Sequence, residues 1–257
     1  MLFSPLEQFS ILPLINIFRG NFIYFSVTNE TLILFLLLFF SAVFFKSLLF
    51  FSKDNTLSAV PTHWQALIEL NYNLILSLIL ENIKDKKAQA FFPLISTLFS
   101  FILLLNLIGL VPYSFTLTSH LILTFLLSVS IFFGINVLAV KKHGIKFFAL
   151  FLPTGTSVAL AFLLTPIEVI SYVFKPISLG IRLFANMMAG HTLLKVIAGF
   201  CATLATSGSF FLVLLHFVPL LILVPLFALE LGVALIQAFV FSILICIYLQ
   251  DSLYSSH

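Results

Sequence analysis

Residues 88–140 read AQAFFPLISTLFSFILLLNLIGLVPYSFTLTSHLILTFLLSVSIFFGINVLAV and contain no Asp, Glu, Lys or Arg. A helix that crosses a bilayer needs about 20 apolar residues, so this stretch is long enough for two crossings. The turn between them is expected at residues 111–114 (VPYS), because proline cannot donate a backbone hydrogen bond inside a helix. We therefore predict membrane spans over residues 91–111 and 119–140.

The whole chain has the composition of a membrane protein. Of its 257 residues, 61% are hydrophobic and 8% are charged, whereas soluble globular proteins have about 25% charged residues. This composition excludes an ordinary cytosolic enzyme, a disordered tail and a nucleic-acid binder. The net charge of +3 is too small to form a basic patch. Cys201 and Cys246 both lie in apolar runs, so neither a disulfide framework nor a thiolate metal site is indicated.

Three further apolar regions and one amphipathic region complete the predicted architecture. A first span is expected over residues 31–51, with Lys46 extending its ammonium group toward the interface. Residues 147–200 and 209–250 are also apolar, and the former region is too long for one upright helix. Residues 64–84 mix apolar and polar side chains, which fits a helix lying in the interface plane. A short, imperfect span is the alternative for that region.

The predicted fold is an all-α integral membrane protein, a single polytopic domain over residues 1–257 with five transmembrane helices and one interfacial amphipathic helix. Its orientation follows from the connecting segments, because inner-side loops carry an excess of Lys and Arg. Two connections are rich in lysine, and the turns at residues 111–119 and 201–209 have neither Lys nor Arg. The basic residues are Lys46, Lys53, Lys84, Lys86 and Lys87 in one connection and Lys141, Lys142 and Lys146 in the other. We therefore expect the N-terminus on the outer side and the C-terminal His257 on the inner side.

Ionisable residues inside the last two apolar regions indicate function, because charges in a bilayer are costly. Glu168 lies fourteen residues before Arg182, and Asp251 lies fourteen residues after Gln237. Fourteen residues span about 21 Å along a helix. If Arg182 and Gln237 are level on two antiparallel helices, Glu168 and Asp251 are level too. The sequence thus predicts an inner acidic pair and a central tier of arginine and amide.

An outer tier is predicted from His191 and Glu230, which lie within about one helical turn of each other in depth in this arrangement. Asn186 is four residues from Arg182 and shares its face. His191 falls about 180° from Arg182 around an ideal helix. The outer tier therefore either lies off the arginine face or requires a bend near Gly190.

These residues also have purely structural interpretations. Arg182 could anchor at an interface or pair with Glu168, and His191 with Glu230 could be a packed neutral pair. Other polar residues are better explained by anchoring or packing: Lys175 and Lys195 as interface anchors, Asn106 as an interhelical hydrogen-bonding group, and His120 and His216 as interface histidines.

A guanidinium in an apolar site stays protonated and cannot release its own proton. A carboxylic acid brought within about 4 to 6 Å would lose its proton, because the opposite charge favours the ionised form. Flanking His and Glu side chains could relay protons to water on either side. This is what a proton exchanger with two separate aqueous paths requires. The carboxylate that faces Arg182 must come from another subunit, because the central tier holds no spare acid.

The motif around Arg182 is LGIRLFAN (179–186), followed by AGH (189–191), Glu230 and LIQAFV (235–240). These residues resemble the a-subunit family of F-type ATP synthases, and the likeness spans roughly residues 88–251. The supporting stretches are LIGLVPYS (107–114), KHG (142–144) and IYLQD (247–251). The order of His191 and Glu230 and the opening SPLEQF (4–9) resemble the mitochondrial members.

The resemblance implies a role for each tier. Arg182 would face the essential carboxylate of the rotating c-ring. The other implied positions are His191 and Glu230 in the intermembrane-space half-channel, Glu168 and Asp251 in the matrix half-channel, and Asn186 and Gln237 beside the arginine. The resemblance also implies that residues 147–200 and 209–250 form a long, strongly tilted hairpin against the ring.

The same resemblance implies that the chain couples proton flow to ATP synthesis without a catalytic site of its own, and the sequence contains no Gly-rich phosphate loop. The implied partners are the c-ring, other FO and peripheral-stalk subunits, the F1 head, a second ATP synthase in a dimer, and the lipid bilayer. The implied location is the mitochondrial inner membrane, with the N-terminus in the intermembrane space and the C-terminus in the matrix. No cofactor, metal or nucleic acid is expected.

Three other classes of membrane protein are less compatible with the sequence. A stand-alone cation-coupled transporter would be expected to show an internal repeat and a midplane site within one chain, and neither is found. A redox subunit of the cytochrome b kind needs paired axial histidines on two helices, whereas the histidines here stand alone. A purely structural subunit leaves the unpaired Arg182 unexplained.

Overall fold

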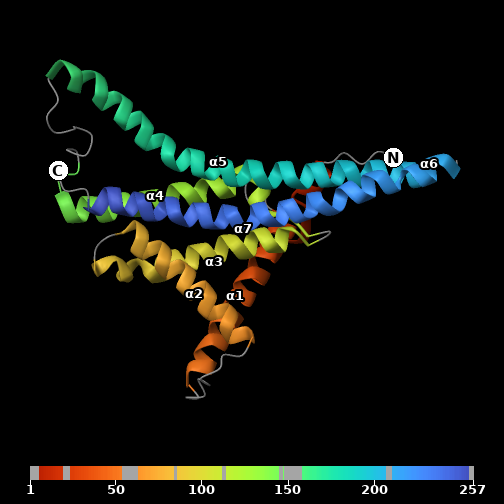
Figure 1. Ribbon diagram of the computed structural model, residues 1–257, viewed down its shortest axis with the longest axis horizontal. Coiled ribbons are helices and arrows are strands. Elements are labelled where there is room, and N and C mark those ends of the chain that lie inside the picture. Colours follow the sequence, from red (N-terminus) through yellow and green to blue (C-terminus); the bar gives the residue numbers. More distant parts are fainter. Residues whose placement is uncertain are drawn as a thin grey trace. The chain divides into compact units, whose positions relative to one another are not determined.

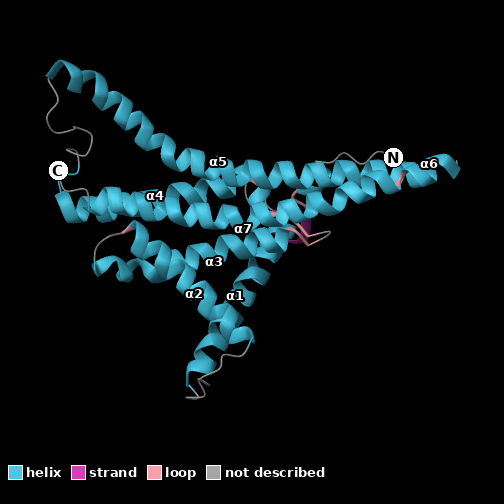
Figure 2. Ribbon diagram, in the orientation of Figure 1, coloured by secondary structure: helices cyan, strands magenta, loops and turns pink. Residues whose placement is uncertain are grey.

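The computed structural model describes residues 6–19, 24–53, 63–83, 86–111, 114–144, 147, 158–206 and 210–254. Helices make up most of this part of the chain (Figures 1 and 2). The α-helices are α1 (Asn29–Lys53), α2 (His63–Asn82), α3 (Phe92–Gly109), α4 (Leu121–His143), α5 (Val158–Ala205), α6 (Phe210–Leu215) and α7 (Phe217–Tyr254). The short elements are the 3-10 helices η1 (Glu7–Phe9), η2 (Lys86–Phe91) and η3 (Leu117–Ser119) and the strands β1 (Pro13–Arg19) and β2 (Tyr24–Thr28).

Four helices in the described residues are long and apolar enough to cross a membrane, and they correspond to α3, α4, α5 and α7. Their exposed surface is itself apolar. Phe162 on α5 is 86% exposed, Leu221 on α7 is 77% exposed and Ile122 on α4 is 74% exposed. Soluble monomers rarely expose large apolar patches, so this surface is suited to lipid. The chain is therefore a helical membrane protein. A crossing by α1 and an interfacial position for α2 stay predictions.

The apolar region predicted over residues 209–250 is divided in the structure. α6 ends at Leu215, and α7 begins at Phe217 after a turn at His216. Pro219 has no N–H to donate to the carbonyl of Leu215, four residues earlier, so an unbroken helix would lose a hydrogen bond here. Several residues that carried the predicted turn and orientation lie outside the described residues: Pro112, Tyr113, Lys84, Lys146 and His257.

The N-terminal segment forms a short antiparallel hairpin that the sequence analysis did not predict. β1 pairs with β2 through Pro13 opposite Thr28 and Asn16 opposite Ser26, with two shifts of register. The strand sequences, PLINIFR and YFSVT, contain several of the β-branched and aromatic residues that favour strands. The all-α description therefore holds for the membrane helices and not for this hairpin.

Asn29 joins the hairpin to α1. Its Oδ1 accepts hydrogen bonds from the backbone N–H of Glu30 at 3.0 Å and of Leu12 at 3.2 Å. Its Nδ2 donates to the carbonyl oxygen of Ser10 at 3.2 Å. The first N–H groups of a helix have no intrahelical acceptor, and a side-chain amide at the helix start supplies one.

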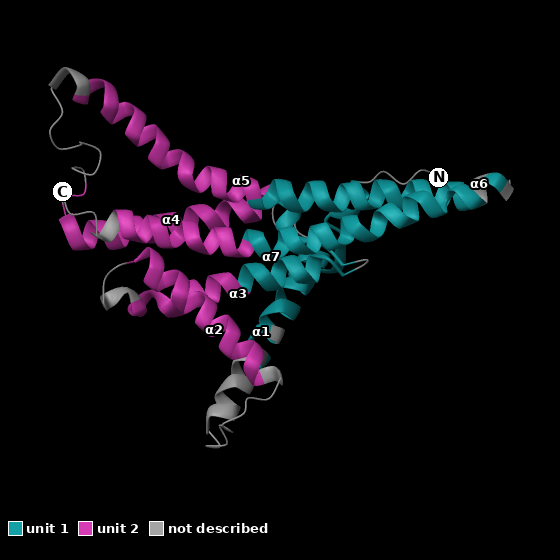
Figure 3. Cartoon of the chain, in the orientation of Figure 1, with its two compact units in different colours: residues 1–56, 101–120, 183–237 teal, residues 57–100, 121–182, 238–257 magenta. Residues whose placement is uncertain are grey.

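The chain divides into two compact units, and each is described by itself (Figure 3). Unit 1 comprises residues 1–56, 101–120 and 183–237, and unit 2 comprises residues 57–100, 121–182 and 238–257. Helices α3, α5 and α7 contribute residues to both units.

In unit 1, the helices meet around a small buried core. Leu110, Met187 and Ala234 are buried together, with Leu107 packed against them. Asn106 on α3 is fully buried, and its Nδ2 donates to the carbonyl oxygen of Ala234 on α7 at 3.3 Å. The predicted role of Asn106 as an interhelical hydrogen-bonding group is therefore confirmed.

In unit 2, α4 and α5 approach closely at Gly180. A Cβ at this position would lie 2.7 Å from Oγ of Ser128, 3.1 Å from Cα of Phe125 and 3.1 Å from the carbonyl oxygen of Thr124. Two of these neighbours are backbone atoms, which cannot move aside as a side chain can. Small residues at such crossings let helix backbones pack closely in membranes, so Gly180 sets the distance between these helices.

Prolines remove hydrogen bonds from the part of α5 that lies in unit 2. Pro166 and Pro176 both lie within the helix, and each lacks the N–H that a helix interior uses. Pro176 therefore gives no hydrogen bond to the carbonyl of Tyr172, four residues earlier. Figure 1 shows α5 changing direction along this part of its course, and proline is a common cause of such a change.

We expect Gly180→Ala to destabilise the protein by roughly 1–3 kcal/mol, because the added methyl group would overpack the crossing of α4 and α5. The measurement is the melting temperature of the detergent-extracted protein. Gly134→Ala on α4 is the matched control, since no atom lies within 4 Å of a Cβ there. Equal melting temperatures for the two variants would contradict the close approach at Gly180.

Candidate functional site

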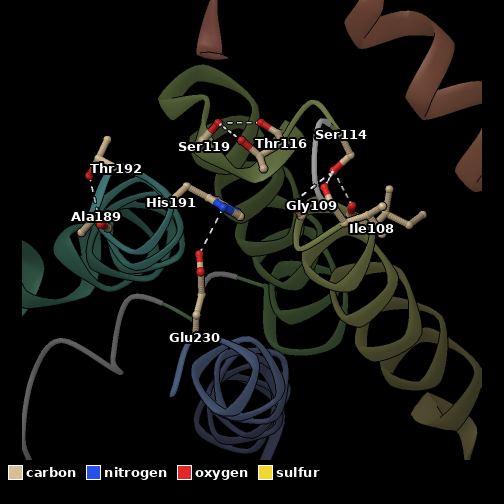
Figure 4. Close-up of polar contacts among 10 residues, drawn as sticks. Ile108, Gly109, Ser114, Thr116, Ser119, Ala189, His191, Thr192 and Glu230 are labelled. Carbon is tan, nitrogen blue, oxygen red and sulfur yellow. Dashed lines mark hydrogen bonds and ion pairs between the residues drawn. The ribbon is translucent and has the colours of Figure 1, made fainter. Parts of the chain in front are cut away.

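A histidine and a glutamate come together inside unit 1 (Figure 4). Nδ1 of His191 on α5 lies 3.2 Å from Oε1 of Glu230 on α7, and the two side chains are 12% and 4% exposed. A buried carboxylate is costly unless it has a partner, so each side chain depends on the other. The structure thus brings together the two residues predicted for the outer tier.

Gly190 makes the room for this contact. A Cβ at Gly190 would lie 2.8 Å from Oε1 and 3.1 Å from Cδ of Glu230. Helix α5 continues through Gly190 to Ala205. The glycine therefore lets the Glu230 side chain lie against the backbone of α5, next to His191.

Several buried polar atoms of unit 1 have no hydrogen-bond partner among the described residues. They are Nε2 of His191, both carboxylate oxygens of Glu230, Nε2 of Gln237, Oδ1 of Asn106 and Oγ1 of Thr118. His191 and Glu230 lie within ion-pair distance, but their approach is not aligned as a hydrogen bond. Most buried polar groups in proteins have a hydrogen-bond partner, so these atoms keep unused hydrogen-bonding capacity, and those of His191 and Glu230 belong to groups that can gain or lose a proton.

The second ring nitrogen of His191 approaches the end of α3. A Cβ at Gly109 would lie 3.7 Å from Nε2 of His191 and 3.1 Å from Cγ2 of Thr116. The hydroxyl groups of Thr116 and Ser119 lie 2.6 Å apart, and Ser119 also donates to the carbonyl of Thr116 at 2.6 Å. Figure 4 shows the imidazole and these hydroxyl groups beside Gly109. Thr116 therefore depends on the lack of a side chain at Gly109, whereas His191 lies at ordinary contact distance from that position.

An amide pair links α5 to α7 in the same unit. Nδ2 of Asn186 donates to Oε1 of Gln237 at 3.0 Å, and Gln237 is 3% exposed. These residues were predicted as polar neighbours of Arg182. Arg182 is four residues before Asn186 in the sequence of α5 and belongs to unit 2.

Unit 2 holds an ion pair that differs from the predicted inner pair. Nζ of Lys175 on α5 lies 3.5 Å from Oδ2 of Asp251 on α7, with side-chain exposures of 35% and 48%. The sequence analysis placed Asp251 and Glu168 at the same depth, as an inner acidic pair, and assigned Lys175 to interface anchoring. In the structure, it contacts a carboxylate on the next helix.

Arg182 and Glu168 are exposed side chains of α5 in unit 2. Neither forms an ion pair with another described residue, so the alternative in which Arg182 pairs with Glu168 is not observed. An exposed guanidinium on a membrane helix is accessible to an acid from another subunit.

The other polar residues named in the sequence analysis have separate surroundings. His120 stacks on Phe115 with ring centroids 5.0 Å apart, and the carbonyl of His216 accepts a bond from Sγ of Cys201 at 3.6 Å. Lys195 is half-buried on α5. Among the described residues, no group of three or more His, Cys, Asp or Glu could hold a metal ion.

Comparison with known proteins gives one consistent family. Residues 31–250 match the sequence family described as ATP synthase A chain. A protein named ATP synthase subunit a from Pylaiella littoralis is 50% identical, over 97% of this chain and 98% of its own length. Proteins of the same name are 47% identical in Brassica napus, over 97% of this chain and 96% of the relative, and 44% identical in Acanthamoeba castellanii, over the full length of both.

We expect Gly190→Ala to separate His191 from Glu230, because the new methyl group would lie where Oε1 of Glu230 now lies. The measurement is the ¹⁵N chemical shift of the His191 ring in solid-state spectra of the protein in bilayers. The Gly190→Ala shift should resemble that of Glu230→Gln. Gly199→Ala on α5 is the control, because no atom lies within 4 Å of a Cβ there. An unchanged His191 signal in Gly190→Ala would contradict the contact.

Proposed function

Because this chain belongs to the ATP synthase A chain family, the proton-translocating subunit of the FO sector, we propose that its two sets of paired ionisable residues serve two separate proton half-channels. The chain is an integral membrane protein and a component of the multi-subunit ATP synthase, with no catalytic site of its own. The assignment of residues to each half-channel is our proposal.

The buried pair of His191 and Glu230 is the observation that carries the proposal. An imidazole can accept a proton on one ring nitrogen and release one from the other. Nδ1 of His191 faces the carboxylate of Glu230, and Nε2 has no hydrogen-bond partner among the described residues. The separation of 3.2 Å between Nδ1 of His191 and Oε1 of Glu230 is within the range over which a proton passes once the two groups align as a hydrogen bond. We assign His191 and Glu230 to the outer half-channel, on the intermembrane-space side.

Arg182 acts at the step between the two half-channels, where the ring acid gives up its proton. A carboxylic acid beside its guanidinium releases a proton, because the positive charge favours the carboxylate. Arg182 has no ion-pair partner among the described residues and its side chain is exposed, so it is available to an acid of the c-ring. Asn186, four residues after Arg182 on α5, and its hydrogen-bond partner Gln237 on α7 contribute neutral hydrogen-bonding groups. Because both side chains are neutral, they do not compete with the carboxylate of the ring acid for the positive charge of Arg182.

The inner half-channel uses Asp251 and Glu168. Asp251 is about half exposed and pairs with Lys175, and Glu168 is an exposed carboxyl group on α5. A carboxylate can accept a proton released from the ring acid and pass it to water. We place this path on the matrix side, because the lysine-rich connections are expected on that side.

We also propose how the helices are arranged in the membrane. Five crossings are made by α1, α3, α4, α5 and α7, while α2 lies in the interface plane and α5 with α7 forms a tilted hairpin against the c-ring. The N-terminus lies in the intermembrane space and the C-terminus in the matrix of a mitochondrion. The partners are the c-ring, the peripheral stalk and other FO subunits, the F1 head and a second ATP synthase in a dimer.

A stand-alone cation-coupled transporter is not favoured. The match to the ATP synthase A chain family covers most of the chain. An exposed arginine that needs an acid from another subunit also fits a component of a complex better than a transporter that acts alone.

We expect Arg182→Ala to abolish proton-coupled ATP synthesis in the reconstituted holoenzyme, because a neutral side chain cannot favour the ionised ring carboxylate. The measurement is ATP synthesis driven by an imposed proton gradient. Ser178→Ala, an exposed polar position one turn earlier on α5, should synthesise ATP normally. Retained coupling in a fully assembled Arg182→Ala enzyme would refute the central role of the arginine.

We expect His191→Ala and Glu230→Ala each to slow proton flux by roughly tenfold or more, since each removes a proton-transfer group. The measurement is passive proton conduction through the membrane sector, with assembly checked by co-purification of the other subunits. Thr192→Ala is the control, because that hydroxyl donates to the carbonyl of Ala189 in its own helix. Unchanged flux in both variants would refute the outer half-channel.

A further inference from the structure

Lys175 has three attractive partners in unit 2. Its Nζ lies 3.5 Å from Oδ2 of Asp251. The same atom lies 5.3 Å from the ring centroid of Tyr248 and 5.6 Å from that of Tyr172. A cation within about 6 Å of an aromatic centroid is attracted to the ring. The ammonium group is therefore held by two rings as well as by the carboxylate.

The spacing of these residues explains how two helices build the cluster. Tyr172 and Lys175 are three residues apart on α5, and Tyr248 and Asp251 are three residues apart on α7. Residues at this spacing share one face of a helix. Each helix thus presents one aromatic ring and one charge of opposite sign to the other.

The rings are also held from a third helix. The hydroxyl of Tyr172 donates a short hydrogen bond to Oδ1 of Asn136 on α4. The ring of Phe132 on α4 lies 4.8 Å from the ring of Tyr172 and 6.4 Å from that of Tyr248. These contacts do not involve Asp251. The rings of Tyr172 and Tyr248 therefore stay in place around the ammonium group when the charge of Asp251 changes.

The backbone at this point of α5 depends on such side-chain contacts. Pro176 follows Lys175 directly and gives no hydrogen bond to the carbonyl of Tyr172. This turn of α5 therefore has one backbone hydrogen bond fewer. The contacts of Tyr172 with α4 and of Lys175 with α7 help to hold it in place. A lysine that served as an interface anchor would extend to water and would not need these partners.

From this geometry, we propose that Lys175 is a positioning residue of the inner half-channel, which holds the carboxylate of Asp251 in place on the proton path. The inference rests on the proposed function above, which places Asp251 on the proton path. A proton that arrives binds a carboxylate oxygen of Asp251, and that O–H bond breaks when the proton leaves to water.

The charged and titratable groups around Asp251 include Lys175 and Tyr172 on α5 and Tyr248 on α7. Removing the cation at Lys175 leaves the carboxylate of Asp251 without this ion-pair partner, so the dependence of synthesis on the inner-side pH should change. The pair is partly exposed, so the expected loss is modest, about threefold.

The test uses the ATP synthase holoenzyme in liposomes, with the pH of each side varied separately at fixed membrane potential. Lys175→Gln should lower ATP synthesis about threefold and change the inner-side pH profile, with no change in the outer-side profile. Lys175→Arg should restore both properties, because it keeps the charge and the ring contacts. Lys195→Gln on the same helix is the matched control. Identical inner-side profiles for Lys175→Gln and Lys195→Gln would overturn the proposal.

A second pair of variants covers the case in which Lys175→Gln does not assemble. Tyr248→Leu removes one of the two rings that contact the ammonium group of Lys175, whereas Tyr248→Phe keeps that ring. A shifted inner-side profile in Tyr248→Leu alone supports the proposal, and equal profiles overturn it.

Asp251→Asn separates this proposal from the function on which it rests. If Asp251→Asn leaves synthesis and the inner-side profile unchanged, the proposed inner half-channel is wrong. If Asp251→Asn impairs synthesis while Lys175→Gln does not, only the positioning role of Lys175 is wrong.

Discussion

The cost of placing a charge away from water governs this structure. Outside its connections, the chain keeps very few ionisable side chains, and the described ones that pair do so between α5 and α7. In unit 1, contacts join residue 186 to 237 and residue 191 to 230. The numbering rises on one helix as it falls on the other, so the helices run antiparallel there. Helices α3 and α4 supply mainly packing and neutral hydrogen bonds.

Much of the fold could be predicted because a bilayer leaves so few choices. Charge-free runs show where the membrane helices lie, and helical rise shows that His191 and Glu230 reach similar depths. The N-terminal hairpin was not predicted. Strand pairing depends on the partner strand as well as on local composition. The break at His216 could have been found, since Pro219 marks it in the sequence.

The candidate site was predictable for single residues more than for their partners. Equal spacings of fourteen residues place Glu168 at the depth of Asp251 on straight helices, but that arithmetic does not show which side chains meet. The long side chain of Lys175 reaches across to the next helix, and Pro176 removes a backbone hydrogen bond from α5 at this point. The intervals of three residues from Tyr172 to Lys175 and from Tyr248 to Asp251 were visible in the sequence and would have indicated the cluster.

The glycines show a different limit of sequence reasoning. Gly180 and Gly190 lie against neighbouring helices, while Gly134 and Gly199 face open space, and nothing in their immediate sequence distinguishes the two kinds. For Gly190, the contact has a consequence for variation on the opposite helix. A methyl group at position 190 would lie 2.8 Å from the present place of Oε1 of Glu230, so that carboxylate would have to move. The size of the residue at position 190 therefore limits which acid fits at position 230.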